Sequence, residues 1–239
     1  MARVHVLLKK EELDDHRLPG KVVVVLDVLF ATSSIATALA HGATEVVPTL
    51  DGEAARAEAA RRPAGSYVLA GELNATTLPG FAHPTPLALV AQGLAGRSLI
   101  YSTTNGTVAV RKAAAAERVY AASLLNGRAV VDHLVRHAAG ETVLLVCAGS
   151  ADAFNLEDFY GAGYLVSLLA GAGPPPDLTD AAQAALLLHE HADALDCLSR
   201  SRVGRMMLER GLERELAYAA RKSPLDVVPV LRDGRLEAA

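Results

Sequence analysis

Several short apolar runs in the chain end in polar residues of kinds that can do chemistry. The polar residues that follow these runs are Asp27, Glu72, the segment 102–107 and the segment 147–150. Short β-branched runs are typical of strands that are buried on both faces of a sheet. Open α/β sheets bind their ligands beyond the carboxyl ends of such strands. We therefore predict that these polar residues gather at one edge of a sheet and form an active site.

The strongest single signal is the segment Ser102 to Thr107, between a predicted strand and a predicted helix. Its hydroxyls, its amide and the backbone N–H groups of a helix N-terminus can all donate hydrogen bonds to an anion. An ordinary helix cap would need only one or two such residues. We predict that an anionic ligand contacts this segment, through Thr103, Thr104, Asn105, Gly106 and Thr107.

Asp27 lies where a buried strand emerges, and the hydroxyl residues Thr32 and Ser33 follow in the next turn. A carboxylate with nearby hydroxyls can hold Mg²⁺ through oxygen ligands. The alternative is that Asp27 only caps the helix that follows. Glu72, with Asn74 shortly after it, taken alone is an ordinary surface carboxylate. Its candidacy as a site residue depends on the convergence of the strand ends.

Glu157 and Asp158 open another predicted helix, and two interpretations of them stay open. They could form a second cluster of carboxylate ligands for a metal ion. Alternatively, Asn155 caps the helix, Asp158 completes an arrangement like a capping box, and both acids favour the helix dipole.

Two other patterns look catalytic but have the wrong spacing. Cys147 could be a thiolate nucleophile, but Ala153 stands where cysteine phosphatases place a phosphate-binding Arg. We therefore expect Cys147 to be a packed residue. His189 and His191 are separated by one residue on a predicted helix, so they point about 200° apart and cannot chelate one ion.

The elements that must position these residues alternate between strands and helices. Strands are predicted at residues 4–8, 21–26, 45–48, 67–70, 98–101, 118–122, 143–146 and 226–231. Helices are predicted at residues 32–40, 52–62, 87–94, 108–116, 127–139, 156–169 and 180–199, with another helix to about residue 220. This alternation favours an α/β fold with a mainly parallel or mixed sheet. Asp233 and Gly234 fit a tight hairpin turn.

The composition excludes several functional classes. A net charge of −4 gives no support for nucleic-acid binding, which calls for a basic surface. No run approaches the roughly 20 apolar residues of a membrane span, and no signal peptide is evident. The two cysteines have no paired spacing, which favours a reducing, cytoplasmic location. The segment 171–176 is the clearest break in the pattern, but the sequence after it has too little predicted strand to build a core of its own. We therefore interpret it as an internal loop and expect one domain over residues 1–239.

In this order, the segments resemble the 2-phosphosulfolactate phosphatase family over nearly the whole chain. Residues 27–33 look like its "DVLRATS" segment, residues 71–74 like the start of "GERNG", and residues 102–107 match "STTNGT". The resemblance implies a three-layer α/β/α domain. It also implies Mg²⁺-dependent hydrolysis of a phosphate monoester on a small sulfonated or carboxylated acid. In that family the reaction belongs to coenzyme M synthesis.

The chain also departs from the family pattern. Phe30 and Leu73 stand where that pattern has arginines, and Ala75 replaces a glycine. Guanidinium groups are natural partners of a highly anionic substrate. Two alternatives therefore stay open: a phosphatase with a less charged substrate, for which Phe30 and Leu73 make an apolar wall, and an inactive anion-binding protein. Other cations could also reach the site, and the candidates are Arg111, Lys112 and Arg128.

Our leading prediction is a Mg²⁺-dependent phosphatase that acts on a small anionic phosphorylated metabolite and forms a homodimer. The predicted catalytic residues are Asp27, Glu72 and Glu157. The predicted metal ligands are Asp27, Glu72, Glu157 and Asp158. The predicted substrate contacts are Thr32, Ser33, Asn74 and the segment Thr103 to Thr107.

Overall fold

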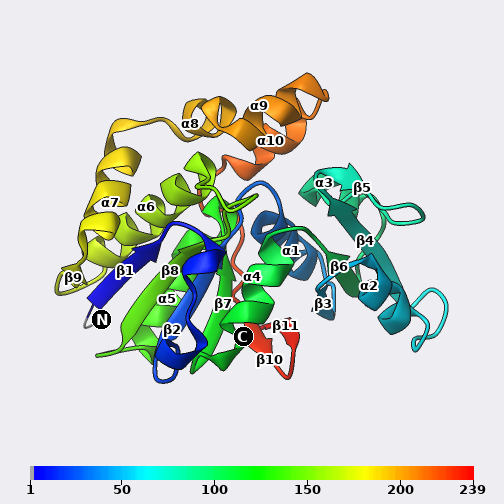
Figure 1. Ribbon diagram of the computed structural model, residues 1–239, viewed down its shortest axis with the longest axis horizontal. Coiled ribbons are helices and arrows are strands. Elements are labelled where there is room, and N and C mark those ends of the chain that lie inside the picture. Colours follow the sequence, from blue (N-terminus) through cyan, green and yellow to red (C-terminus); the bar gives the residue numbers. More distant parts are fainter. Residues whose placement is uncertain (1–2) are drawn as a thin grey trace.

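The computed structural model describes residues 3–239, and one mixed sheet runs through it (Figure 1). Its strands are β1 (Arg3–Leu7), β2 (Val22–Leu26), β3 (Glu45–Thr49), β4 (Tyr67–Leu73), β5 (Thr76–Thr77), β6 (Ser98–Ser102), β7 (Arg118–Ala122), β8 (Thr142–Cys147), β9 (Asp177–Leu178), β10 (Pro229–Arg232) and β11 (Arg235–Ala238). Across the sheet they follow the order β5-β4-β6-β3-β11-β10-β7-β2-β8-β1-β9.

The sheet consists of two parallel blocks joined by a hairpin. One block is β4-β6-β3 and the other is β7-β2-β8-β1-β9. The C-terminal hairpin β10–β11 lies between them: Val230 pairs with Tyr120 of β7, and Leu236 pairs with Val46 of β3. The hairpin turn has φ of 48° at Asp233 and 78° at Gly234, as a two-residue turn of the I′ type requires. The predicted turn is confirmed.

Helices cover both faces of the sheet. They are α1 (Ala31–Ala40), α2 (Gly52–Ala59), α3 (Pro86–Val90), α4 (Gly106–Lys112), α5 (Gly127–His137), α6 (Leu156–Gly171), α7 (Asp180–His191), α8 (Ala194–Arg200), α9 (Arg202–Glu209) and α10 (Glu213–Ala219). Strand β2 shows why both faces need cover, because all five of its residues are buried. Val22, Val24 and Leu26 pack toward α5 and α6, whereas Val23 and Val25 pack toward α1, α3 and α4. The predicted three-layer α/β/α fold is confirmed.

Two predicted helices are each divided in the structure. The predicted helix 180–199 breaks after α7, where Asp193 accepts a hydrogen bond from the Asp196 N–H and so caps α8. The next one breaks at Gly211, whose φ of 70° ends the helical path between α9 and α10. The predicted helix 87–94 is shorter in the structure and begins one residue earlier: Pro86 is the first residue of α3, a position that suits proline.

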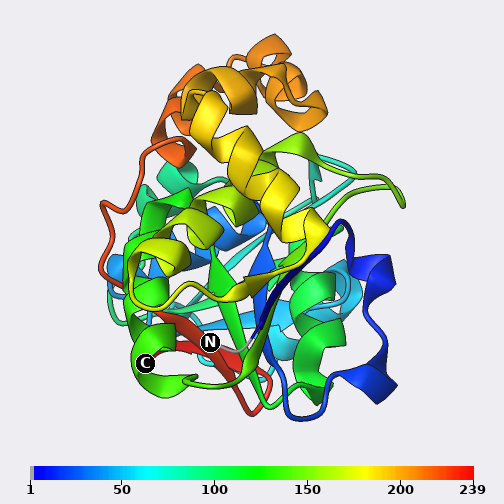
Figure 2. The same ribbon diagram turned by 90° about the vertical axis from the view of Figure 1, so that its left-hand side faces the viewer.

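Helices α8–α10 lie at the opposite end of the molecule from the C-terminal hairpin, as both ribbon views show (Figures 1 and 2). Asp27 follows directly after β2, Glu72 lies near the end of β4, and Thr103 follows directly after β6. None of the helices formed by residues 3–239 is long and apolar enough to cross a bilayer.

Candidate active site

Asp27 lies in the turn between β2 and α1, and hydroxyls fix that turn from within. The Thr32 hydroxyl accepts a hydrogen bond from the Asp27 N–H and donates one to the Asp27 carbonyl. The Ser33 hydroxyl donates to the carbonyl of Val28. Both hydroxyl residues are fully buried and lie outside the cavity described below. The structure thus places Thr32 and Ser33, which we predicted to contact substrate, where they hold the Asp27 turn and do not line the cavity.

Glu72 joins the end of β4 to the loop that follows β6. Its Oε1 accepts a hydrogen bond from the Thr104 N–H at 2.6 Å, and its Oε2 accepts from the Thr104 hydroxyl and from the Ala75 N–H. The Thr104 hydroxyl in turn accepts from the Asn74 N–H at 2.9 Å. The predicted Glu72, Asn74 and Thr104 are thus brought together, and both Glu72 oxygens are engaged in the protein.

The segment 102–107 contributes residues of two kinds. Thr103, Thr104 and Asn105 line the cavity. Thr107 is fully buried and bonds back to Thr103, so it shapes the loop. A Cβ atom at Gly106 would lie 2.5 Å from Asp27 Oδ2, so this glycine allows α4 to approach the Asp27 carboxylate. Gly106 and Thr107, which we predicted to contact substrate, therefore lie outside the cavity lining and support the loop that borders it.

Glu157 and Asp158 lie behind the cavity and are not part of its lining. Asp158 accepts hydrogen bonds from the Val28 N–H at 2.8 Å and the Gly149 N–H at 3.2 Å, which joins the ends of β2 and β8. Asn155 makes no side-chain cap of α6, so the predicted capping arrangement is absent at this helix start. Both Glu157 oxygens are buried and have no hydrogen-bond partner among the described residues.

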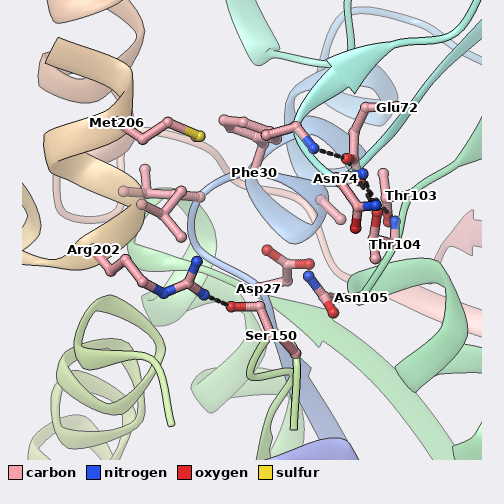
Figure 3. A pocket seen from close by; sticks show the side chains of 15 residues that line it. Asp27, Phe30, Glu72, Asn74, Thr103, Thr104, Asn105, Ser150, Arg202 and Met206 are labelled. Atoms are coloured by element: carbon pink, nitrogen blue, oxygen red, sulfur yellow. Dashed lines mark hydrogen bonds between the residues drawn. The ribbon is translucent and has the colours of Figure 1, made fainter. Parts of the chain in front are cut away.

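The cavity has a volume of about 180 Å³ and two chemically distinct sides (Figure 3). Its polar side carries Asp27, Glu72, Asn74, Thr103, Thr104, Asn105 and Ser150. The apolar residues of the lining are Leu29, Phe30, Ala31, Ala75, Ala151, Val203 and Met206, and Phe30 and Met206 mark an apolar side away from Asn105 (Figure 3). Arg202 completes the lining from the first turn of α9.

Asp27 is the most electrostatically perturbed residue of the lining. Burial, the Glu72 carboxylate and the Glu157 carboxylate together raise the pKa of Asp27 to about 7. Burial also raises the pKa of Glu157, and burial with the Glu157 charge raises the pKa of Asp158 well above its usual range. Lys10 opposes the rise at Asp27. The buried acids therefore favour a cation or a proton in their midst.

Lys10 also orients Asn105. The buried Lys10 ammonium donates to Asn105 Oδ1 at 3.0 Å. The amide nitrogen of Asn105 consequently turns toward Asp27 and the cavity (Figure 3). Sequence reasoning missed Lys10, because nothing in its surroundings distinguishes it from the charged residues of the first loop.

The residues of the cavity fit a magnesium ion, but with fewer carboxylate ligands than we predicted. Mg²⁺ is usually held by one or two carboxylates, with substrate phosphate oxygens and waters completing its shell. Asp27 and Glu72 can supply such carboxylates from the cavity lining. Across residues 3–239, no three His, Cys, Asp or Glu side chains gather closely enough to hold one metal ion. The predicted four-carboxylate set of Asp27, Glu72, Glu157 and Asp158 is therefore not assembled.

The sequence matches the family described as 2-phosphosulpholactate phosphatase over residues 7–234. This chain belongs to that family. A protein of Symbiobacterium thermophilum is 39% identical over 92% of this chain and 94% of its own length. One of Carboxydothermus hydrogenoformans is 38% identical over 98% of this chain and 96% of its own. Both are named "Probable 2-phosphosulfolactate phosphatase".

Two departures from the pattern of the 2-phosphosulpholactate phosphatase family have different positions in the structure. Phe30 is buried and lines the cavity. Leu73 is 59% exposed and lies outside the lining, because alternate residues of β4 point to opposite faces. The predicted apolar wall of Phe30 and Leu73 is corrected: Leu29, Val203 and Met206 accompany Phe30 instead.

The cation that reaches the cavity of this family member is also not one that we predicted. Arg111, Lys112 and Arg128 lie outside the lining, and Arg202 lies within it. The Arg202 guanidinium donates to the Ser150 hydroxyl and, at 3.4 Å, to Asn155 Oδ1. Arg202 lies in α9, which is remote in sequence from the strands that contribute the polar side. The residues around it form no motif that would have identified it.

Cys147 and His189 belong to the two patterns that we rejected as catalytic because of their spacing, and both are packed residues in the structure. Cys147 is fully buried, and burial raises the pKa of its thiol well above the usual range, so a thiolate nucleophile is disfavoured. His189 contacts the Lys222 ammonium at 3.0 Å. Its ring also packs against Tyr160 and Tyr164.

Proposed function

We propose that this protein is a metal-dependent phosphatase that hydrolyses a phosphate monoester of a small acidic metabolite. The single observation that carries the proposal is the buried Asp27, which lines the polar side of a small cavity together with Glu72 and Asn105. Family membership and the printed names of the relatives support the same activity, with 2-phosphosulfolactate as the reference substrate. Coenzyme M synthesis, a cytoplasmic location and a homodimer stay predictions.

Each residue of the polar side has a role in this proposal. Asn105 directs its amide nitrogen at the phosphoryl oxygens, while Thr103 and Thr104 border the same position. Glu72 keeps this loop in place through Thr104. Mg²⁺, held by Asp27 with Glu72 as the second candidate ligand, would neutralise charge on the phosphoryl group.

Asp27 also suits the proton transfer that hydrolysis requires. A general base is most effective when its pKa lies near the working pH, and without a metal ion the pKa of Asp27 is raised to about 7. Because bound Mg²⁺ would lower that pKa, Asp27 acts as the base where Glu72 holds the ion. In the proposed step, water attacks phosphorus and loses a proton to the Asp27 carboxylate as the ester P–O bond breaks. The departing alkoxide takes a proton from solvent water, and Asp27 returns its proton to solvent, so an alcohol and inorganic phosphate leave the cavity.

The test is phosphate release from a panel of phosphomonoesters, 2-phosphosulfolactate included, with Mg²⁺ and with a chelator. We expect Mg²⁺-dependent release, and we expect Asp27→Asn to lower kcat by about 10²- to 10⁴-fold. Asp132→Asn, an exposed carboxylate change on α5, is the matched control and keeps full activity. If the folded native protein releases no phosphate from any ester, an anion-binding protein without catalysis replaces this proposal.

A further inference from the structure

The apolar side of the cavity is formed by residues that pack into the hydrophobic core. Leu29 is 5% exposed and Phe30 is 9% exposed, and both belong to the main hydrophobic core. Val203 and Met206 of α9 are partly buried and pack against the same core. In the close view, the Met206 side chain extends toward the Phe30 ring (Figure 3). The two sides of this wall are therefore contributed by separate parts of the fold.

The charges of the lining limit the number of anionic groups that a substrate can present. Asp27 and Glu72 are acidic, and among the residues that the structure describes only Arg202 brings a cation into the lining. A phosphoryl group at the polar side is served by the magnesium site and Asn105. One further anionic group can be paired with Arg202. A third would have to lie against apolar side chains, where it would lose water without gaining a partner.

Arg202 is arranged to receive that one additional anion. Its Nη2 is held by the Ser150 hydroxyl and Asn155. Its Nε and Nη1 form no hydrogen bond with any residue in the range 3–239. The guanidinium points toward the cavity between the polar side and the apolar wall (Figure 3). A planar guanidinium with two free donors matches a carboxylate.

Resting on the proposed function, we propose that the substrate is a phosphate ester of a small acid with one carboxylate and one uncharged, aliphatic substituent. The carboxylate pairs with Arg202, and the aliphatic substituent packs against Phe30 and Met206. The chain is thus expected to discriminate against a second strongly anionic group, such as a sulfonate, at the position of that substituent.

The experiment compares 2-phospholactate with 2-phosphosulfolactate, which differ only in a methyl group against a sulfomethyl group. With Mg²⁺ present, we expect kcat/KM of the native protein to favour 2-phospholactate by about tenfold or more. An equal or opposite preference overturns the inference and leaves the proposed phosphatase standing. If neither ester is hydrolysed, nor any other of the panel, the proposed function itself fails.

Variants of the apolar wall locate the discrimination. Phe30→Arg is expected to shift the ratio of kcat/KM toward 2-phosphosulfolactate by about tenfold, and Phe30→Leu is expected to keep the native preference. Because Phe30 is buried, Met206→Lys, with Met206→Leu as its control, provides the same test at a more exposed position. If neither added cation shifts the ratio, the wall does not select the substituent and the inference is wrong.

A third comparison tests Arg202. Ethyl phosphate is 2-phospholactate without its carboxylate, so the ratio of their kcat/KM values measures recognition of that group. In Arg202→Gln this ratio is expected to fall about tenfold or more, and Arg202→Lys should restore part of it. A purely structural role for Arg202 would lower both values together and leave the ratio unchanged, which would contradict the assignment.

Discussion

Asp27 shows how a single residue can be valuable for chemistry and costly for the fold. Its carboxylate is buried, and of the charged residues around it the like charges of Glu72 and Glu157 raise its pKa most. Ionised Asp27 therefore destabilises the folded protein until a cation compensates it. Strain of this kind is expected at functional positions.

This cost predicts a pH-dependent stability difference in the metal-free protein. The folded pKa of Asp27 is about 7 and its ordinary value is 3.8, so native Asp27 binds the extra proton between these values. Stability is consequently lost as pH rises from about 4 to 7. In EDTA, Asp27→Asn should be more stable than the native protein at pH 8 by about 2–4 kcal/mol, as measured by urea unfolding.

The same urea series at lower pH supplies the control. Near pH 3, below both pKa values, native Asp27 is largely protonated in the folded and the unfolded protein, so the advantage of Asp27→Asn should nearly vanish. A difference that stays constant from pH 3 to 8 would contradict the raised pKa. Adding Mg²⁺ at pH 8 should stabilise the native protein more than the variant, because binding to the folded form adds stability.

Ala75 offers an independent prediction of stability. It occupies the left-handed region with φ of 61°, next to Asn74 at 50°, in the tight turn between β4 and β5. A residue with a Cβ atom pays about 1–2 kcal/mol in this region, which glycine does not. Ala75→Gly should therefore raise the free energy of unfolding by about 0.5–1 kcal/mol after the entropy of glycine is deducted. A lower midpoint in urea would contradict this account.

At the scale of elements, α10 and α3 are joined by one buried carboxylate. Glu215 of α10 accepts hydrogen bonds from the Thr85 hydroxyl and from the N–H groups of Leu87 and Ala88 at 2.8–3.0 Å. It therefore satisfies the N-terminus of α3, whose own cap residue makes no side-chain cap.

Removing this carboxylate should loosen the helical end of the molecule. We expect Glu215→Ala to lower the free energy of unfolding by about 2–4 kcal/mol, because three donors lose a charged acceptor. Glu190→Ala, at an exposed position on α7, should change it by less than about 0.5 kcal/mol. If the two variants had equal urea midpoints, the hydrogen bonds that Glu215 accepts would not stabilise the fold.

Elements marked by local pattern were predictable, and those that depend on distant partners were not. The run of valines in β2 predicts a strand buried on both faces, and Asp233 with Gly234 predicts the turn of the last hairpin. The short strands β5 and β9 carry no pattern of their own, because they exist only by pairing with β4 and β1. The break at Asp193 was missed because alanine and leucine continue on both sides of it.

The site shows the same limit at the scale of the whole molecule. Asp27, Glu72 and Thr103 were predictable because each follows a strand, and strand ends of parallel blocks converge. Glu157 and Asp158 have the right residue types, but their place behind the cavity follows from how α6 packs. Arg202 and Met206 enter the cavity only through the path of the last four helices, which no local pattern in the sequence specifies.

The whole sheet depends on its last strands. Leu236 is fully buried and Val230 nearly so, and the hairpin β10–β11 pairs with both β7 and β3. Deleting residues 226–239 would expose apolar core and two strand edges. We expect the truncated protein to be insoluble or unfolded by circular dichroism, since exposed edges promote aggregation.

A milder change at the same place tests the turn residues while the hairpin is kept. Asp233→Asn keeps a two-residue turn that tolerates φ above zero, so this variant should fold and remain soluble. A truncated protein that is soluble and retains the native circular dichroism spectrum would show that the two parallel blocks associate without the hairpin.

The position of the hairpin links the order of synthesis to the order of assembly. A ribosome releases β3 and β7 before β10 and β11, the two strands that lie between them in the sheet. The nascent chain can form helices and separate parallel pairs, but the sheet closes only after β10 and β11 have emerged. Chains that stop before residue 226 therefore present unpaired strand edges, which mark them for chaperones and proteases. The fold thus makes the synthesis of this hairpin a condition for joining the two parallel blocks.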